Sequence, residues 1–391
     1  MHDSHPDIRF DPYQDIRPYS DEEVCEVLER LGRSVPLHQA LVEYQFPRSP
    51  RLFRTLLTKL VGFQLRRHFG PVTTIAAFQE WLTQWVYELV ETTTTDVEIS
   101  GLDKLWGGGP YLWISNHRDI AMDPTLVNYA LMKHAWATAH IAIGDNLLQN
   151  AVVADLMRLN KSFIVKRSAE SNREKLRELQ RLSAYVRDSM AAGHSIWIAQ
   201  REGRAKDNRD QTDTAVLKML ALSGRDEKLP FADAMRRLNP VPVVVQYEWD
   251  PCDVMKAREL VALDTHGSYE KKPGEDTSSM LTGLRGHKGR VRISFGQPMM
   301  ADDMQDAATM AVCADEQMLA MSQVFPANYA ALRLLQQEFG LYREVMTKYP
   351  DGLELPLKMM RLRCEGEADA VKVKLLTNYA APLIAESEVA V

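Results

Sequence analysis

Two hydrophobic patterns divide the chain. After an irregular start, apolar residues recur every three or four positions in 1–96 and again in 301–391, which predicts helices. Ser20 and Glu23 have the spacing of a capping box at the start of the first helix. In 97–300, short apolar runs bounded by turn residues alternate with helix-spaced segments. We therefore expect an N-terminal helical region, an α/β domain and a C-terminal helical extension over these three ranges.

The middle range contains seven candidate strands and four helices between them. Strands are expected near 97–99, 111–115, 138–143, 162–166, 195–200, 241–247 and 290–295, and helices near 124–133, 145–158, 171–192 and 212–223. This alternation is typical of an α/β fold with a central, mostly parallel mixed sheet flanked by helices.

Segment 51–69 in the N-terminal region has no acidic residue. Its apolar residues share one helical face, and its basic residues lie mostly on the other: Leu52, Phe53, Leu56, Leu57, Leu60 and Phe63 against Arg51, Arg54, Lys59 and Arg66. The ordinary interpretation is a helix that packs its apolar side on the core. The alternative is a helix that lies in an anionic lipid interface.

Composition narrows the class of protein. The 391 residues carry a net charge of -6 with a pI near 6.0, which argues against a nucleic-acid binder. The polar, acidic start does not resemble a secretory signal, and no apolar run approaches the roughly 20 residues of a membrane span. We expect a cytoplasmic protein whose membrane contact is peripheral.

The cysteines suggest neither a metal site nor disulfides. Cys25, Cys252, Cys313 and Cys364 are far apart and form no C-x-x-C pair. A reducing compartment fits this pattern, and we expect no metal and no bound cofactor.

The stretch 111–124, YLWISNHRDIAMDP, is the main candidate for chemistry. Its apolar run reads as a buried strand that ends in a polar cluster containing His117, Asp119 and Asp123. A carboxylate that accepts the Nδ1 proton of a histidine leaves Nε2 free to act as a general base. Most histidines near an aspartate are structural, so the pair alone does not establish catalysis.

Polar residues also follow three other candidate strands. Lys166 and Arg167 end one, Arg201-Glu202-Gly203-Arg204 ends another, and Tyr247-Glu248 ends a third that otherwise reads as a core strand. Each cluster alone reads most simply as a solvated strand end. Because a parallel sheet brings the carboxyl ends of its strands to one edge, we expect the clusters to share a site.

In order and spacing these blocks resemble the glycerolipid acyltransferase family, which includes glycerol-3-phosphate and lysophosphatidate acyltransferases. The family's N-H-x-x-x-x-D, F-I-x-R, E-G-x-R and V-P-V blocks correspond to Asn116-His117 with Asp123, 163–167, 202–204 and 241–243. The resemblance covers about 97–300. Lys166-Arg167-Ser168 and Tyr247-Glu248 look closer to the glycerol-3-phosphate branch.

One spacing differs from that family. Five residues separate His117 from Asp123, where the family has four. Either Asp123 still reaches the ring, with Pro124 in the first helical position and Asp123 at the cap, or Asp119 takes its role.

The resemblance implies direct acyl transfer without a covalent enzyme intermediate. His117, paired with Asp123, would deprotonate an acceptor hydroxyl that attacks the thioester of acyl-CoA or acyl carrier protein. The acceptor would be glycerol 3-phosphate or a lysophospholipid. Residues that would hold its phosphate or shape that site are Arg118, Lys166, Arg167, Glu202, Gly203 and Arg204.

The same resemblance favours 51–69 as a membrane-surface element on the inner face of the membrane, because the product is amphiphilic. Two other readings stay open. One is acyl transfer to a lipid acceptor without phosphate, and the other is a lipid-binding protein of this fold that has no activity.

Overall fold

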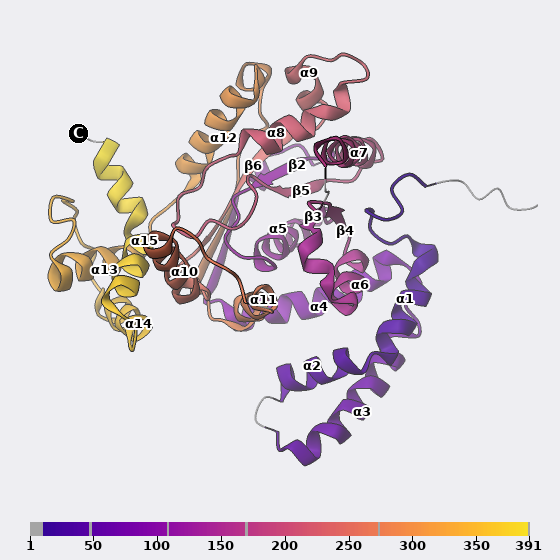
Figure 1. Cartoon of the computed structure of the whole chain (residues 1–391), viewed down its shortest axis with the longest axis horizontal. Coiled ribbons are helices and arrows are strands. Elements are labelled where there is room, and N and C mark those ends of the chain that lie inside the picture. The colour runs from indigo at the N-terminus through magenta and orange to yellow at the C-terminus, as the bar shows by residue number, and fades with distance from the viewer. Residues whose placement is uncertain (1–10, 47–48, 108, 169–170, 273, 390–391) are drawn as a thin grey trace, which may run out of the picture. The chain divides into compact units, whose positions relative to one another are not determined.

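The computed structural model describes residues 11–46, 49–107, 109–168, 171–272 and 274–389 (Figure 1). The chain forms two compact units, and each is made of two separate segments. Unit 1 comprises Met1–Leu82 and His140–Ala192, and unit 2 comprises Thr83–Ala139 and Gly193–Val391. The three-domain division expected from the sequence stays a prediction.

Unit 2 contains a mostly parallel sheet with the strand order β1-β7-β6-β2-β5. Strand β2 pairs in parallel with both β5 and β6, β1 pairs in parallel with β7, and only β6 and β7 run antiparallel among these described pairs. Its strands are β1 (Asp96–Ser100), β2 (Leu112–Ser115), β5 (Ile196–Ala199), β6 (Pro240–Tyr247) and β7 (Arg290–Phe295). The expected α/β fold with a mixed sheet is confirmed.

Helices cover both faces of this sheet, which explains why its central strands are continuous apolar runs. Helices α8 and α12 lie on one face and α5 lies on the other (Figure 1). Around the sheet are α5 (Met122–Lys133), α8 (Thr214–Ala221), α9 (Phe231–Arg236), α10 (Asp253–His266), α11 (Glu275–Arg285) and α12 (Ala307–Met321), with the short η1 (Leu102–Lys104), η3 (Leu222–Gly224) and η4 (Ala301–Met304).

The C-terminal helices form a second core within unit 2. They are α13 (Pro326–Leu334), the π-helical turn η5 (Leu335–Phe339), α14 (Glu354–Cys364) and α15 (Asp369–Val389). Leu332, Leu375 and Leu376 are buried where α13 and α15 pack together, and Trp249 and Ala257 join this core from the region of α10. The C-terminal extension is therefore attached to the segment that follows β6.

Unit 1 combines a pair of parallel strands with a helical arm. The strands are β3 (His140–Gly144) and β4 (Ser162–Val165). The helices are α1 (Asp21–Arg33), α2 (Val35–Gln45), α3 (Arg51–Phe69), α6 (Ala151–Leu159), α7 (Asn172–Ala191) and the short η2 (Asp145–Gln149), while α4 (Ile75–Thr93) continues into unit 2. The capping box of Ser20 and Glu23 forms as expected.

Helix α3 buries a different face from the one expected to pack on the core. Val61, Leu65 and Phe69 are buried in the unit 1 core. Four of the six apolar residues expected to pack on the core are instead exposed: Phe53 by 59%, Leu56 by 64%, Leu60 by 49% and Phe63 by 58%. Leu57 does pack against that core and is partly buried, and the side chain of Leu52 is not among those described. The ordinary interpretation of this helix was therefore wrong for these four residues. Among the described residues, no helix has the length and apolar character needed to cross a membrane.

Candidate active site

The site lies at the carboxyl end of β2, the strand between β5 and β6. Since β2 is parallel to both neighbours, the residues that follow all three strands meet at one edge of the sheet. Asn116, directly after β2, fixes this junction: its Oδ1 accepts from the Val245 backbone N–H at 2.8 Å, and its Nδ2 donates to the Val245 carbonyl at 3.1 Å. This buried amide extends the β2–β6 pairing and sets the position of His117.

His117 contacts Asp123, not Asp119. The distance between His117 Nδ1 and Asp123 Oδ2 is 2.9 Å, and the same oxygen accepts from the backbone N–H groups of Arg118 at 2.6 Å and Asp119 at 2.9 Å. A carboxylate held by two main-chain donors favours the tautomer with the proton on Nδ1. Nε2 is then the basic atom of a ring whose side chain is 14% exposed.

Asp119 instead closes the turn before α5. Its Oδ1 accepts from the backbone N–H groups of Ala121 at 3.0 Å and Met122 at 2.8 Å. Burial, together with the charge of Asp123, raises the pKa of Asp119. The helix begins at Met122, so the expectation that Asp123 would be its cap was wrong, and Asp123 lies in the first turn.

Tyr247, the last residue of β6, is a site residue to which the sequence analysis gave no role. Its hydroxyl donates to Asp123 Oδ1 at 2.6 Å. Burial and the nearby charge of Asp123 raise the pKa of Tyr247 well above its ordinary value, so the phenol remains a donor. Its position at a strand end, beside the V-P-V block, was the available sequence signal.

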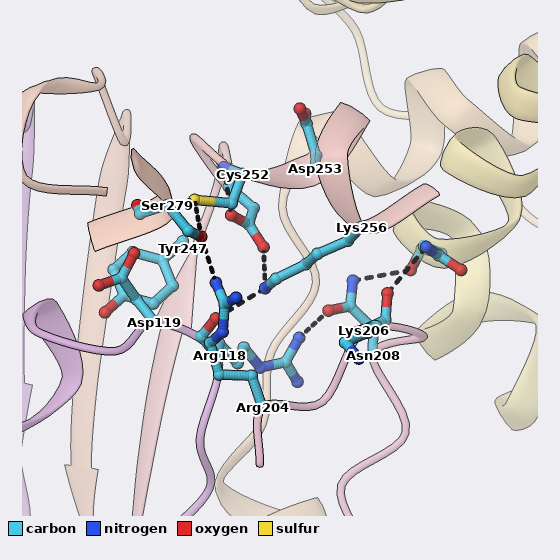
Figure 2. Close-up of polar contacts among 12 residues, drawn as sticks. Arg118, Asp119, Arg204, Lys206, Asn208, Tyr247, Cys252, Asp253, Lys256 and Ser279 are labelled. Atoms are coloured by element: carbon cyan, nitrogen blue, oxygen red, sulfur yellow. Dashed lines mark hydrogen bonds and ion pairs between the residues drawn. The ribbon is translucent and has the colours of Figure 1, made fainter. Parts of the chain in front are cut away.

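The loop after β5 brings Arg204 to the same edge. The Ala205 backbone N–H donates to the His117 carbonyl at 2.7 Å. Gly203 has φ +74°, a conformation that favours glycine, and Glu202 is exposed. The half-buried Arg204 guanidinium donates to Ser279 Oγ of α11 at 2.7 Å, and Figure 2 shows this pair. Arg204 makes no ion pair with any residue in the described ranges.

Arg118 has a carboxylate partner within the protein, and its expected part in substrate binding stays a prediction. Its guanidinium forms a 2.6 Å ion pair with Asp210. It also donates to Asn208, as Figure 2 shows. Burial alone would lower the pKa of Arg118, but the charge of Asp210 outweighs it and keeps the arginine charged. Asp210 also accepts from Asn116 Nδ2 at 3.1 Å. In this arrangement Arg118 ties the His117 loop to the loop after β5.

Lys166 and Arg167 belong to unit 1, whereas His117 and Arg204 belong to unit 2. Lys166 pairs with Asp15 and lies 3.7 Å from Glu178. Arg167 is exposed, and its backbone N–H donates to Asp145 at 3.1 Å. Their role in phosphate binding stays a prediction.

No candidate metal centre emerges from the part of the chain that is described, where no three His, Cys, Asp or Glu side chains cluster suitably. Cys25, Cys252, Cys313 and Cys364 are free thiols.

The match to a family model agrees with the sequence motifs. Residues 96–239 match the family model described as Acyltransferase. The comparison with curated proteins gave no match. Among solved structures, the 1-acyl-sn-glycerophosphate (LPA) acyltransferase PlsC from Thermotoga maritima has 12% sequence identity and a TM-score of 0.38, over 77% of this chain and 97% of that chain. The family match spans His117, Asp123 and Arg204 and supports the resemblance to glycerolipid acyltransferases; residues 96–239 therefore form an acyltransferase domain.

Proposed function

We propose that the protein transfers a fatty acyl group from an acyl thioester to a hydroxyl group of glycerol 3-phosphate or a lysophospholipid. The observation that carries this proposal is the pairing of His117 Nδ1 with Asp123 at 2.9 Å, in a loop hydrogen-bonded to the one that presents Arg204. The donor is an acyl thioester of coenzyme A or acyl carrier protein.

The reaction is a direct displacement at the thioester carbonyl. His117 Nε2 accepts the proton of the acceptor hydroxyl as its oxygen attacks the acyl carbon. The new C–O ester bond forms, the C–S bond breaks, and the departing thiolate receives a proton from the imidazolium. Asp123 stabilises that imidazolium through Nδ1, while Tyr247 and the backbone donors hold Asp123 in place.

Arg204 favours an acceptor that carries a phosphate. Its guanidinium donates to the neutral hydroxyl of Ser279, and among the described residues it forms no ion pair. A phosphate bound by this guanidinium would hold the acceptor hydroxyl close to His117. Part of the binding energy would then serve to orient the reacting groups. Lys166, Arg167 and Glu202 are proposed as further parts of this site.

Helix α3 offers a surface for the membrane in which lipid acceptors and products reside. Its exposed row of Phe53, Leu56, Leu60 and Phe63 is apolar, and the helix carries only basic charges. Apolar side chains flanked by lysine and arginine suit the interface of an anionic bilayer. We therefore place the protein at the inner face of the membrane as a peripheral enzyme.

The test is acyl transfer by purified protein. Acyl-CoA and acyl carrier protein donors are incubated with glycerol 3-phosphate, lysophospholipids and lipid acceptors without phosphate, and the products are identified by mass spectrometry. We expect acyl esters of the acceptors that carry a phosphate. In His117→Ala we expect the rate of acyl transfer to fall by about 10²- to 10⁴-fold. Normal turnover by a folded His117→Ala variant would refute the mechanism. Exclusive use of acceptors without phosphate would favour the alternative substrate class, and no transfer would favour a lipid-binding role.

A further inference from the structure

The C-terminal helix α15 reaches two loops beside the candidate active site. It lies outside residues 96–239, which match the acyltransferase model. Two consecutive residues, Asn378 and Tyr379, make the contacts. Both are buried, at 9% and 4% exposure.

Asn378 contacts the loop after β5 through two reciprocal hydrogen bonds. Its side-chain Nδ2 donates to the Lys206 carbonyl at 2.8 Å, and its own carbonyl accepts from Asn208 Nδ2 at 2.7 Å. The Oδ1 of Asn208 accepts from the Arg118 guanidinium, as Figure 2 shows. Asn208 therefore links α15 to the residue that follows His117.

Tyr379 contacts the segment that follows β6. Its hydroxyl donates to Asp253 at 2.7 Å and accepts from the Asp250 backbone N–H at 2.9 Å. Asp250 in turn pairs with Lys256, whose buried Nζ donates to the Arg118 carbonyl at 2.7 Å (Figure 2). A second hydrogen-bonded route from α15 thus ends at the same residue beside His117.

These polar contacts are distinct from those that attach α15 to the protein. Leu375, Leu376 and Leu383 pack α15 into the C-terminal core. Asn378 and Asn208 instead form hydrogen bonds to main-chain groups of each other's segments. These hydrogen bonds hold Lys206 and its neighbours in position. Ala205 in that loop is the residue bonded to the His117 carbonyl.

We propose that Asn378 is a positioning residue of the acyltransferase site, acting through Asn208 and Lys206 on the loop that carries Arg204 and on the backbone of His117. Tyr379 supports the same loops through Asp250 and Lys256. The assignment rests on the proposed acyl transfer for its effect on rate. The C-terminal extension is then part of the working enzyme rather than an independent appendage.

Two substitutions separate positioning from general stability. Asn208→Asp keeps an acceptor for Arg118 and tolerates the φ of +57° at this position, but it removes the donor to the Asn378 carbonyl. Asn378→Ala removes the donor to Lys206. Lys374→Ala is the matched control, because Lys374 is on the same helix and pairs with Asp264 at 2.6 Å.

The first measurement is amide hydrogen exchange in the absence of substrate. Both test variants should exchange faster than the wild type in 200–210, including the Ala205 amide, while Lys374→Ala should not. The second is steady-state acyl transfer, in which we expect kcat to fall about 10- to 100-fold in both test variants with a smaller change in the donor KM. Thermal unfolding confirms that each variant is folded, and Asn208→Asp decides the matter if Asn378→Ala does not fold.

The two assays separate failure of this inference from failure of the proposed function. Unchanged exchange in 200–210 would overturn the link between α15 and the loop, whether or not the wild type transfers acyl groups. Faster exchange with unchanged kcat would overturn the positioning role. Faster exchange in a protein whose wild type shows no acyl transfer would support the link and refute the proposed function.

Discussion

Tyr247 donates its phenolic hydrogen to Oδ1 of Asp123 at 2.6 Å, while the other oxygen of that carboxylate lies 2.9 Å from Nδ1 of His117. The tyrosine comes from the end of β6 and the histidine from the loop after β2. Because these strands are neighbours, the sheet itself fixes the separation of the two side chains. The carboxylate is thus oriented from both sides, one of which is a rigid strand.

Tyr247→Phe should lower kcat by about 10-fold and leave the acceptor KM nearly unchanged, because hydrogen bonds to charged groups contribute about 1.5–3 kcal/mol. The substitution removes only the hydroxyl and keeps the ring in place. Steady-state kinetics with purified variant and wild type provides the measurement. A wild-type kcat in the folded variant would show that the backbone donors alone suffice to orient Asp123.

Asp119→Asn should make the protein more stable at neutral pH. Burial and the charge of Asp123 raise the pKa of Asp119 above its ordinary 3.8. Between 3.8 and the raised value the folded state binds more protons than the unfolded state, so this group costs stability as pH rises through that window. Asparagine cannot ionise, and its Oδ1 can still accept from Ala121 and Met122.

The advantage of Asp119→Asn in Tm should therefore grow from acid to neutral pH, where the folded wild type carries the buried, ionised carboxylate. Thermal unfolding of both proteins over a series of pH values measures it. A difference that does not change with pH would mean that Asp119 does not titrate in this range.

Six of the seven expected strands were recoverable from the sequence because they contain short apolar runs that are largely buried, whereas β1 was recoverable from its alternation and has no buried residue. Trp113 and Ile114 of β2, for example, have no exposed surface. The position of His117 at the end of such a run followed from the same pattern. Its pairing with Asp123 was one of two alternatives, and spacing alone could not choose because a helix start can shift by a residue or two.

Other features were missed because their buried faces are polar. Helix α10 was not expected, and among the residues it buries are Asp253, Lys256 and Glu259. A helix that turns charges inward has no apolar stripe for periodicity to detect. The ion pair of Arg118 was missed for a related reason, since sequence does not show that Asp210, 92 residues later, supplies a counter-charge.

Arg204→Ala should raise the KM for phosphate-bearing acceptors about 10- to 100-fold, because a charge-assisted hydrogen bond to phosphate is lost. Lipid acceptors without phosphate should be used as well as before. Ser279→Ala is a graded comparison: it removes the hydroxyl that orients Arg204 and keeps the charge, so its effect should be smaller. The comparison of KM values across acceptors provides the measurement, and an equal rise for both acceptor types would argue against phosphate binding by Arg204.

Replacing Phe53, Leu56, Leu60 and Phe63 together by serine should weaken binding to anionic phospholipid vesicles by at least about 100-fold, because each apolar side chain contributes up to about 1.5–3 kcal/mol when buried. The fold should survive, since the core face of α3, with Val61, Leu65 and Phe69, is untouched.

Vesicle flotation with and without anionic lipid measures this binding. Because basic residues flank the apolar row, the wild type should prefer anionic vesicles, and added salt should weaken its binding. The matched control replaces Val312 and Leu319 of α12, which are also exposed, by serine and should bind as the wild type does. If the α3 variant floats like the wild type, or if the α12 control loses binding equally, contact with the bilayer is not made by this row, and the exposed face of α3 must be assigned another partner.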